Sequence, residues 1–262
     1  HDNPSSKYKF PHDEVYVQYK IDGERCIASW VQELDENGNK VGEPGVRLFS
    51  RIRNEIPFCD HIKKVMHSIY TTFGKVYPPI YNCHFDGELV VPGETRNMMR
   101  SAVSTMRHKH EANERIEFYI FDMVTRVDHP FEKRWTLLTR IMSKVKSAHV
   151  KLVPIPTIAK VKMDDDETIT TLLAEAMGRG YEGLMLRTKD MPYPIGNHRV
   201  DELVKVKKIH DEEFLIIGCY QGRDKEEGLI VFQMQDLHDS TITFGARPCW
   251  PYEVRKEAWD QY

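Results

Sequence analysis

Lys20, Asp22, Gly23 and Arg25 lie within a run of six residues and could together carry out phosphate chemistry. They spell Lys-x-Asp-Gly-x-Arg inside the run YKIDGERC, and extended runs precede and follow it. Gly23 would permit a tight backbone turn, so that an amine, a carboxylate and a guanidinium surround one small volume. This arrangement suits a lysine that attacks a nucleotide phosphate.

The segments around Lys20 are expected to form strands. The run 15–19 is extended, and so is the run 26–30. Asn37-Gly38 is a typical hairpin turn, after which residues 46–51 alternate like a returning strand. We therefore expect Lys20 to lie beside an antiparallel meander, with Ser50 and Arg51 at its far end.

The rest of the chain alternates between helical and extended patterns, which favours an α+β fold. Apolar spacing predicts helices, and short apolar or alternating runs predict strands. The expected helices are 57–73, 133–146 and 167–178, the expected strands are 84–91, 116–124, 182–187 and 203–208, residues 153–156 are expected to be extended, and 96–107 to be a helix or an ordered loop.

Beyond residue 208 the pattern changes to three short strands and a helix, which is most of a small five-stranded barrel. The expected elements are 213–219, 228–234, 240–246 and 250–262. We therefore predict a first domain at 1–210 and a second, OB-fold domain at 211–262, either truncated or partly unordered.

Composition limits the function classes. The chain has 262 residues, 40% hydrophobic and 29% charged, which is typical of a soluble globular protein. Its net charge of −3 argues against a protein that coats nucleic acid through bulk charge, but it leaves room for a local basic groove. No apolar run is long enough for a membrane span and no signal peptide is expected. Five scattered cysteines predict neither a disulfide framework nor a zinc site, and favour a reducing cytosol.

Five polar segments follow one another along the chain: KIDGER, FSR, FDGE, FYIFD, and EGLMLR with LVKVK. In this order they resemble the covalent nucleotidyltransferases, which comprise ATP-dependent DNA ligases, RNA ligases and mRNA-capping guanylyltransferases. The resemblance covers about residues 15–208 and is strongest to small ATP-dependent DNA ligases of the phage or viral type. Arg25 is typical of the ATP-dependent class. The extra N-terminal domain and the cysteine-based zinc site of NAD-dependent ligases are not found.

The resemblance implies that Lys20 attacks the α-phosphate of ATP and forms a lysyl-AMP phosphoramidate. A free lysine has a pKa of about 10.4, so about one side chain in a few thousand is neutral at pH 7. Neighbouring cations, a metal ion and burial must therefore favour the neutral amine. Lys205 and Lys207 alternate along one strand, so both amines point to the same face, and by resemblance they grip the α-phosphate.

The same resemblance assigns the other ligands of the nucleotide and metal. Arg25 and Glu88 would hold the ribose, Phe121 would stack on the base, and Arg51 would reach the nucleotide or the nick phosphate. Glu182 would bind a divalent metal, Mg²⁺, with Asp86 a weaker candidate. The full set of expected cofactor-binding residues is Gln18, Tyr19, Arg25, Arg51, Glu88, Phe121, Glu182, Lys205 and Lys207.

The sequence departs from the family pattern at three points. Arg53 stands where the ligases usually have a glycine, so that loop is expected to run differently. Gln18 stands where many relatives have a glutamate that reads the adenine amino group, although an amide oxygen can also accept that bond. The basic segment that closes the barrel and orients pyrophosphate is not found, and truncation is the simpler explanation.

The expected partner is nicked duplex DNA. The enzyme is expected to be a monomer and not to associate with a membrane. The cytoplasm of a bacterial or phage-infected cell is expected, or the nucleus in a eukaryote. The candidates for phosphate contacts are Arg96, Arg100, Arg107, Lys109, Arg223 and Lys225, each of which is more often a solvated charge. An RNA ligase or a capping guanylyltransferase is the nearest alternative, and a catalytically silent nucleic-acid-binding module is the second.

Overall fold

The computed structural model describes residues 14–94, 96–104, 108–196, 200–208 and 212–262. The chain divides into two compact units, one up to Lys208 and one from Ile209. The boundary expected at 210/211 falls on residues 209–211, which lie outside the described residues. The two units are described separately below.

The first sheet of the larger unit has the strand order β7-β1-β8-β9, and every neighbouring pair is antiparallel. Its strands are β1 (Glu14–Lys20), β7 (Lys160–Lys162), β8 (Gly183–Thr188) and β9 (Leu203–Lys207). The sequence did not predict β7, which is only three residues long. The other three strands match the extended runs expected there.

Helix α4 (Asp166–Gly178) packs on one face of the first sheet. It begins where the Asp165 carboxylate accepts a hydrogen bond from the backbone N–H of Thr168 at 3.0 Å, which satisfies one of the free donors at the helix start. Apolar residues at helical spacing on α4 bury against the alternating apolar residues of the strands. This cluster includes Val15, Val17, Ile169, Leu172, Ala176, Leu184, Leu186, Val204 and Val206.

The second sheet has the order β3-β2-β4-β5-β6, in which only the β5–β6 pair is parallel. Its strands are β2 (Glu24–Leu34), β3 (Lys40–Ser50), β4 (His84–Val90), β5 (Glu117–Val124) and β6 (Val150–Leu152). Residues 153–156, which were expected to be extended, follow β6 directly and are not part of a strand, because β6 ends at Leu152 before the two prolines of that run.

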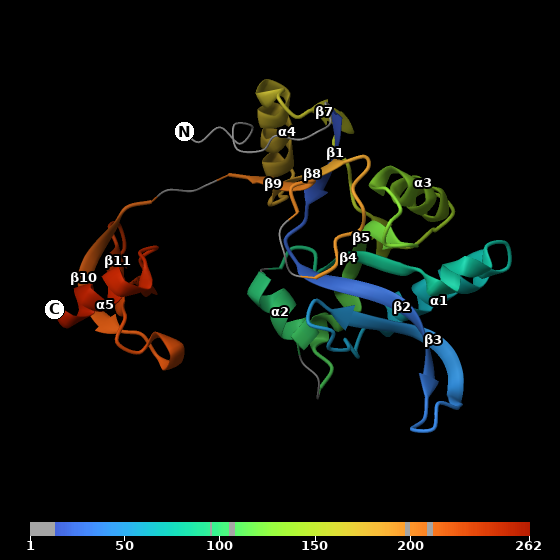
Figure 1. The fold of residues 1–262 in the computed structure, drawn as a ribbon, viewed down its shortest axis with the longest axis horizontal. Coiled ribbons are helices and arrows are strands. Elements are labelled where there is room, and N and C mark those ends of the chain that lie inside the picture. The colour runs from blue at the N-terminus through green and yellow to red at the C-terminus, as the bar shows by residue number, and fades with distance from the viewer. Residues whose placement is uncertain (1–13, 95, 105–107, 197–199, 209–211) are drawn as a thin grey trace. The chain divides into compact units, whose positions relative to one another are not determined.

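Two long helices pack on the second sheet (Figure 1). These are α1 (Asp60–Gly74) and α3 (Phe131–Met142), and the shorter α2 (Arg96–Ser104) adds to the same core. Two 3₁₀ turns, η2 (Pro78–Asn82) and η3 (Glu111–Arg115), connect these elements. The apolar faces of α1, α2 and α3 are buried in this core and contribute Ile62, Met66, Ile69, Met99, Ala102, Leu138 and Ile141. The α+β class expected from the sequence is confirmed.

The two strands that flank the Lys-x-Asp-Gly segment belong to different sheets. β1 pairs with β7 and β8, whereas β2 pairs with β3 and β4. The antiparallel hairpin expected after Lys20 is formed by β2 and β3, but it belongs to the other sheet: Lys20 ends a strand of the first sheet, and the chain crosses to the second sheet before Glu24. The hairpin of β2 and β3 returns Ser50 opposite Cys26, near the start of β2.

The smaller unit contains a three-stranded antiparallel sheet of order β10-β11-β12. Its elements are β10 (Phe214–Gln221), η4 (Asp224–Glu226), β11 (Ile230–Asp236), β12 (Thr243–Ala246) and α5 (Tyr252–Asp260). Arg255 fastens α5 to the sheet, because its guanidinium donates to Glu226 at 3.1 Å and to the carbonyl of Ile230 at 3.2 Å.

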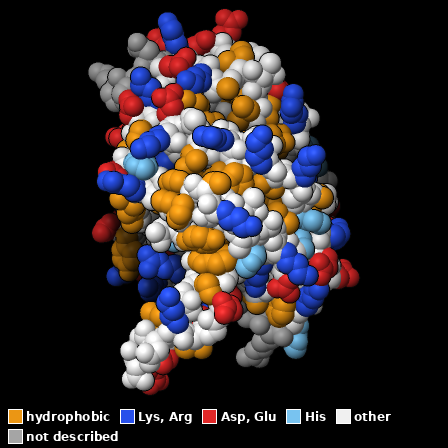
Figure 2. Space-filling view, turned by 90° about the vertical axis from the view of Figure 1, so that its right-hand side faces the viewer, with side chains coloured by type: hydrophobic (Ala, Val, Ile, Leu, Met, Phe, Trp, Pro, Cys, Tyr) orange, Lys and Arg blue, Asp and Glu red, His pale blue; other side chains and the backbone are white. Residues whose placement is uncertain are grey.

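None of the described helices is both long and apolar enough to cross a bilayer. One face of the molecule carries basic and acidic side chains among hydrophobic ones, without a single block of one sign (Figure 2). This distribution agrees with the small net charge of −3.

Candidate functional site

Lys20, Glu182 and Lys207 meet where three neighbouring strands of the first sheet lie side by side. Lys20 is opposite Gly183, and Gly183 is opposite Lys207, so β1, β8 and β9 bring the three side chains together. The Lys20 ammonium hydrogen-bonds the Glu182 carboxylate, whose other oxygen is 3.6 Å from the Lys207 amine. The side chains of Lys20 and Glu182 are 20% and 26% exposed, so the group is accessible to a ligand.

Glu182 is held ionised within this group. Burial opposes its ionisation, but the hydrogen bond and charge of Lys20, together with Lys207, outweigh burial and lower the pKa of Glu182. Lys20 thus has a carboxylate as its ion-pair partner, and the cation expected nearby, Lys207, approaches the same carboxylate.

Two glycines of the motifs are required by close backbone approach. A Cβ on Gly23 would lie 2.2 Å from the Leu89 carbonyl oxygen and 2.9 Å from Cγ of Glu88. A Cβ on Gly183 would lie 2.2 Å from the Val206 carbonyl oxygen, and Gly183 has a φ of 156°. Both glycines therefore let neighbouring segments pack closely around the lysine.

Lys205 and Lys207 point to the same side of β9, as their alternation predicts. Val204 and Val206, which alternate with the lysines, are buried in the core beneath α4, while both lysines are on the exposed side. Lys207 approaches Glu182. The two amines expected to bind the phosphate thus share one face of β9, which β8 separates from the strand of Lys20.

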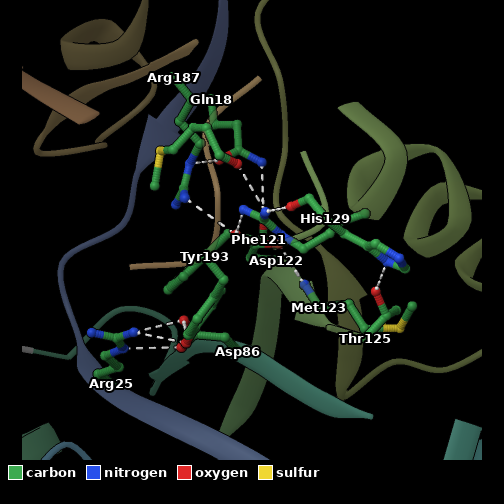
Figure 3. A network of polar contacts seen from close by, with 12 residues as sticks. Gln18, Arg25, Asp86, Phe121, Asp122, Met123, Thr125, His129, Arg187 and Tyr193 are labelled. Carbon is green, nitrogen blue, oxygen red and sulfur yellow. Dashed lines mark hydrogen bonds and ion pairs between the residues drawn. The ribbon is translucent and has the colours of Figure 1, made fainter. Parts of the chain in front are cut away.

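Arg25 and Asp86 form a bidentate ion pair, which Tyr193 completes (Figure 3). The Arg25 guanidinium donates to the two oxygens of Asp86 at 3.0 and 2.7 Å. The Tyr193 hydroxyl donates to Asp86 at 2.7 Å and accepts from Arg25 at 3.1 Å. The prediction that Asp86 binds the metal disagrees with this arrangement, because the buried Asp86 carboxylate already accepts hydrogen bonds from Arg25 and Tyr193.

Glu88 lies opposite Arg25 in the β2–β4 pair, next to the Gly23 turn. Its side chain is half-buried. Burial raises the pKa of Glu88 to about 7, and the charges of Lys20 and Arg25 only partly oppose this rise. Glu88 therefore changes its charge near neutral pH.

Glu88→Gln is expected to flatten the pH dependence of stability. Because the folded-state pKa of about 7 exceeds the ordinary value of 4.5, the stability that Glu88 contributes is present in acid and is lost as the pH rises through 7. The free energy of unfolding should therefore fall by about 2 kcal/mol more in the wild type than in the variant between pH 5 and pH 8. Urea unfolding at these pH values measures the difference, and parallel profiles would contradict the prediction.

Gln18 joins the two sheets next to Phe121 (Figure 3). Its amide nitrogen donates to the carbonyl oxygen of Phe121 on β5 at 3.0 Å, and its amide oxygen accepts from Nε of Arg187 on β8 at 2.9 Å. The Arg187 guanidinium lies 5.3 Å from the centre of the half-buried Phe121 ring. The expected base-reading and base-stacking residues are therefore neighbours.

Asp122 is a fully buried carboxylate bound by two arginines. Arg134 of α3 donates to both of its oxygens at 2.9 Å, and Arg187 approaches one of them at 3.4 Å. The backbone N–H of Met123 adds a further bond at 2.7 Å. Both Asp122 and Arg134 are 0% exposed, so this carboxylate compensates charges that water cannot reach.

Asp122→Asn is expected to destabilise the protein by about 3–5 kcal/mol, because it leaves two arginines buried without their anion. Chemical denaturation measures the loss. Asp128→Asn is the matched control, because Asp128 pairs with Arg126 on the exposed surface and its replacement should change stability little. Equal effects of the two variants would contradict the assignment.

The side chain of Tyr19, which was expected among the cofactor-binding residues, faces away from Lys20. Strand alternation places Tyr19 on the opposite side of β1 from Gln18 and Lys20. Its ring is buried, stacks on Tyr181 with centroids 4.4 Å apart, and its hydroxyl donates to Glu175 at 2.7 Å. Tyr19 is therefore part of the core next to α4.

Arg51 is exposed in the turn that follows β3. In the same turn Arg53 has a φ of 66°, a backbone conformation that glycine adopts most readily. The N–H of Arg53 donates to the Ser50 carbonyl at 2.9 Å. The turn thus keeps a glycine-compatible conformation although arginine occupies it.

The candidate DNA-contacting cations differ in their surroundings. Arg107 and the side chain of Arg96 lie outside the described residues. Lys109 is ion-paired with Glu114 and Arg100 has a partner. Arg223 and Lys225 are exposed in the smaller unit, where Arg223 lines a hollow together with Arg247 and Tyr220.

The donor set around Lys20 fits a metal ion that arrives with a nucleotide. No group of three or more histidine, cysteine or acidic side chains that could hold a metal is present in the described ranges. Mg²⁺ usually takes one or two carboxylates and completes its shell with phosphates and water. Glu182 can supply one such carboxylate.

Sequence reasoning missed Arg134, Arg187 and Tyr193 as parts of this network. Arg134 is one charged residue within a helix, and Tyr193 is in a segment without periodicity. Arg187 offered a signal, because it ends the EGLMLR segment in a strand that is otherwise buried.

Comparison with known proteins assigns the chain to a family. The family model described as ATP dependent DNA ligase domain matches residues 5–207. The chain is 27% identical over 222 residues to the DNA ligase of African swine fever virus (isolate Pig/Kenya/KEN-50/1950), covering 82% of this chain and 47% of that protein. It is 24% identical over 231 residues to the DNA ligase of Halorubrum lacusprofundi, covering 82% and 36%. The chain spans about half, or less, of the length of these curated relatives.

Solved ligase structures share the fold. A Lig E DNA ligase superimposes with a TM-score of 0.64 at 20% identity, covering 94% of this chain and 81% of that one. The ATP-dependent DNA ligase from bacteriophage T7, in complex with ATP, gives a TM-score of 0.57 at 14% identity, covering 100% and 82%. Because the family model spans the Lys20 turn, the Glu182 strand and both lysines of β9, the chain belongs to the ATP-dependent DNA ligase domain family.

Proposed function

We propose that this protein is an ATP-dependent DNA ligase that seals nicks through a lysyl-AMP intermediate on Lys20. The observation that carries the proposal is that Lys20, Glu182 and Lys207 meet at the ends of β1, β8 and β9. One nucleophilic amine, one carboxylate and a second cation at one accessible place are the groups that phosphoryl transfer to a lysine needs.

In the first step the neutral Lys20 amine attacks the α-phosphorus of ATP. An N–P bond forms, the bond from the α-phosphorus to the bridging oxygen breaks, and pyrophosphate leaves. Before the attack the ion pair with Glu182 opens and the Lys20 ammonium gives one proton to water; after the N–P bond has formed, the nitrogen gives a second proton to water. Lys205 and Lys207 then stabilise the charge that develops on the α-phosphate oxygens.

The other residues position the nucleotide. Arg25 and Glu88 face each other across β2 and β4 and are proposed to bind the ribose. Phe121 offers a half-buried ring for stacking, next to the Gln18 amide. Glu182 would hold Mg²⁺, which when bound would neutralise phosphate charge.

In the later steps AMP passes to the 5′-phosphate of a nick, and a 3′-hydroxyl displaces AMP to join the strand. We propose nicked duplex DNA as the partner and a monomer as the working form. Exposed cations such as Arg51, Arg223 and Lys225 are proposed to bind phosphates. The cytoplasm, or the nucleus in a eukaryote, remains the expected location.

Incubation with ATP or GTP labelled at the α-phosphate, in the presence of Mg²⁺, tests the first step. We expect a covalent label from ATP that resists denaturation and is chased onto nicked DNA. A label from GTP alone would favour a guanylyltransferase, and sealing of nicked RNA alone would favour an RNA ligase. Absence of any adduct together with intact DNA binding would favour a catalytically silent binding module.

Gly23→Ala is expected to slow adduct formation at least about tenfold and to cost about 1–3 kcal/mol of stability, because the new Cβ collides with the Leu89 carbonyl oxygen and displaces Glu88 or the turn. Label incorporation and urea unfolding measure the two effects. Gly45→Ala is the control, because a Cβ there meets open space. A Gly23→Ala protein as active as Gly45→Ala would contradict the steric argument.

A further inference from the structure

The amide of Gln18 is held in one orientation by two partners of opposite type. Its oxygen faces Nε of Arg187, which can only donate, at 2.9 Å. Its nitrogen faces the carbonyl oxygen of Phe121, which can only accept, at 3.0 Å. Turning the amide over would place donor against donor and acceptor against acceptor, so Gln18 has a single favourable orientation.

Arg187 is itself fixed in position. It is 4% exposed, it lies 3.4 Å from the Asp122 carboxylate, and its guanidinium is 5.3 and 5.1 Å from the ring centres of Phe121 and Phe131. Burial lowers the pKa of Arg187, although Asp122 opposes the change, and an arginine stays protonated in proteins. A permanent donor is thus aimed at the Gln18 oxygen (Figure 3).

Each end of the amide can make one more hydrogen bond, because the oxygen has a second lone pair and the nitrogen has a second hydrogen. The six-membered ring of adenine presents an N–H donor at N6 beside the acceptor N1, whereas guanine presents the acceptor O6 beside the donor N1–H. An amide that could turn over would serve either purine. An amide locked in one orientation can pair with only one of the two patterns.

We propose that Arg187 is a specificity-determining residue, which locks the Gln18 amide so that it accepts adenine and rejects purines with a 6-oxo group. The proposal rests on the proposed function, because it places the base of the nucleotide beside Phe121 and Gln18. It goes beyond that function because Arg187 contacts no base, and selects it by fixing the residue that does.

Arg187 differs from Arg134, the other arginine at Asp122, in its bond to Gln18. Arg134 already donates to both oxygens of Asp122 at 2.9 Å, so that buried carboxylate has a charged partner without Arg187. Arg134 also donates to backbone carbonyls but has no bond to Gln18. The two arginines therefore share Asp122, and of the two Arg187 alone bonds the amide.

The test compares initial rates of adduct formation at subsaturating ATP, ITP and GTP. ITP has the 6-oxo edge of guanine without its 2-amino group, so it isolates the edge that Gln18 would read. The wild type should prefer ATP over ITP by at least about a hundredfold. Arg187→Met should lower this preference about tenfold, the value of one hydrogen bond, and Arg187→Lys should restore part of it. Arg134→Lys, which disturbs Asp122 but not Gln18, should leave the preference unchanged.

The proposal is overturned if the wild type uses ITP as well as ATP, a result that needs no variant to fold. It is also overturned if folded Arg187→Met, checked by circular dichroism, keeps the wild-type preference, or if Arg134→Lys loses it equally. If Arg187→Met does not fold, Gln18→Met replaces it and should lose the preference as well. Failure of the proposed function is a different result, since the wild type would then form no adduct with any nucleotide.

Discussion

Lys20→Ala is expected to abolish the covalent adduct between the protein and AMP, lowering its rate of formation by on the order of 10⁴-fold or more, equivalent to at least about 5.5 kcal/mol of activation free energy. The reason is chemical: Lys20 supplies the nitrogen of the new N–P bond. Lys207 lies 3.6 Å from the Glu182 carboxylate, but it is on a different strand from Lys20 and therefore cannot take over its position. Label incorporation from ATP measures the loss.

The control is Lys75→Ala, an exposed lysine just after α1, which should retain the wild-type rate. DNA binding by Lys20→Ala should also stay close to that of the wild type, because the change removes one charge from a side chain that is 20% exposed. An adduct that survives in Lys20→Ala at a comparable rate would show that another residue is the nucleophile.

Glu182→Ala is expected to slow adduct formation by about 10²–10³-fold and to raise the magnesium concentration needed for half-maximal rate. Two effects of Glu182 oppose each other. Its negative charge holds Lys20 in an ion pair, which restrains the nucleophile, and the same carboxylate would bind the metal. We expect the loss of the metal ligand to outweigh the release of Lys20.

Glu175→Ala is the matched control for Glu182→Ala. Glu175 is also an ion-paired glutamate, but it bonds Tyr19 and Arg179 on the α4 side of the first sheet. It should therefore leave the rate and the magnesium dependence unchanged. An increased rate for Glu182→Ala at every magnesium concentration would mean that Glu182 serves only to restrain Lys20.

The residues around Lys20 were predictable because short motifs place them. Lys20 ends one strand, Glu182 directly precedes a second, and Lys207 ends a third. Strand alternation depends only on local backbone geometry, so the common face of Lys205 and Lys207 could be derived without the fold. The helices around the second sheet were predictable for the same reason, since their apolar spacing is local.

The partners of charged residues could not be predicted, because they depend on contacts between distant segments. Asp86 was assigned to a metal, but pairs with Arg25, 61 residues away in sequence. Gln18 and Arg187 are 169 residues apart, and their bond exists because β1 pairs with β8. The division of β1 and β2 between two sheets also has no local signal, since Gly23 permits a turn within one sheet or a crossing between two.

Mapping the site of AMP attachment tests the central claim most directly. The protein is incubated with ATP and Mg²⁺, digested with protease, and the peptides are sequenced by mass spectrometry under conditions that preserve the phosphoramidate. We predict AMP on the side chain of Lys20 and on no other residue. AMP on Lys205, Lys207 or another side chain, with Lys20 unmodified, would contradict the account.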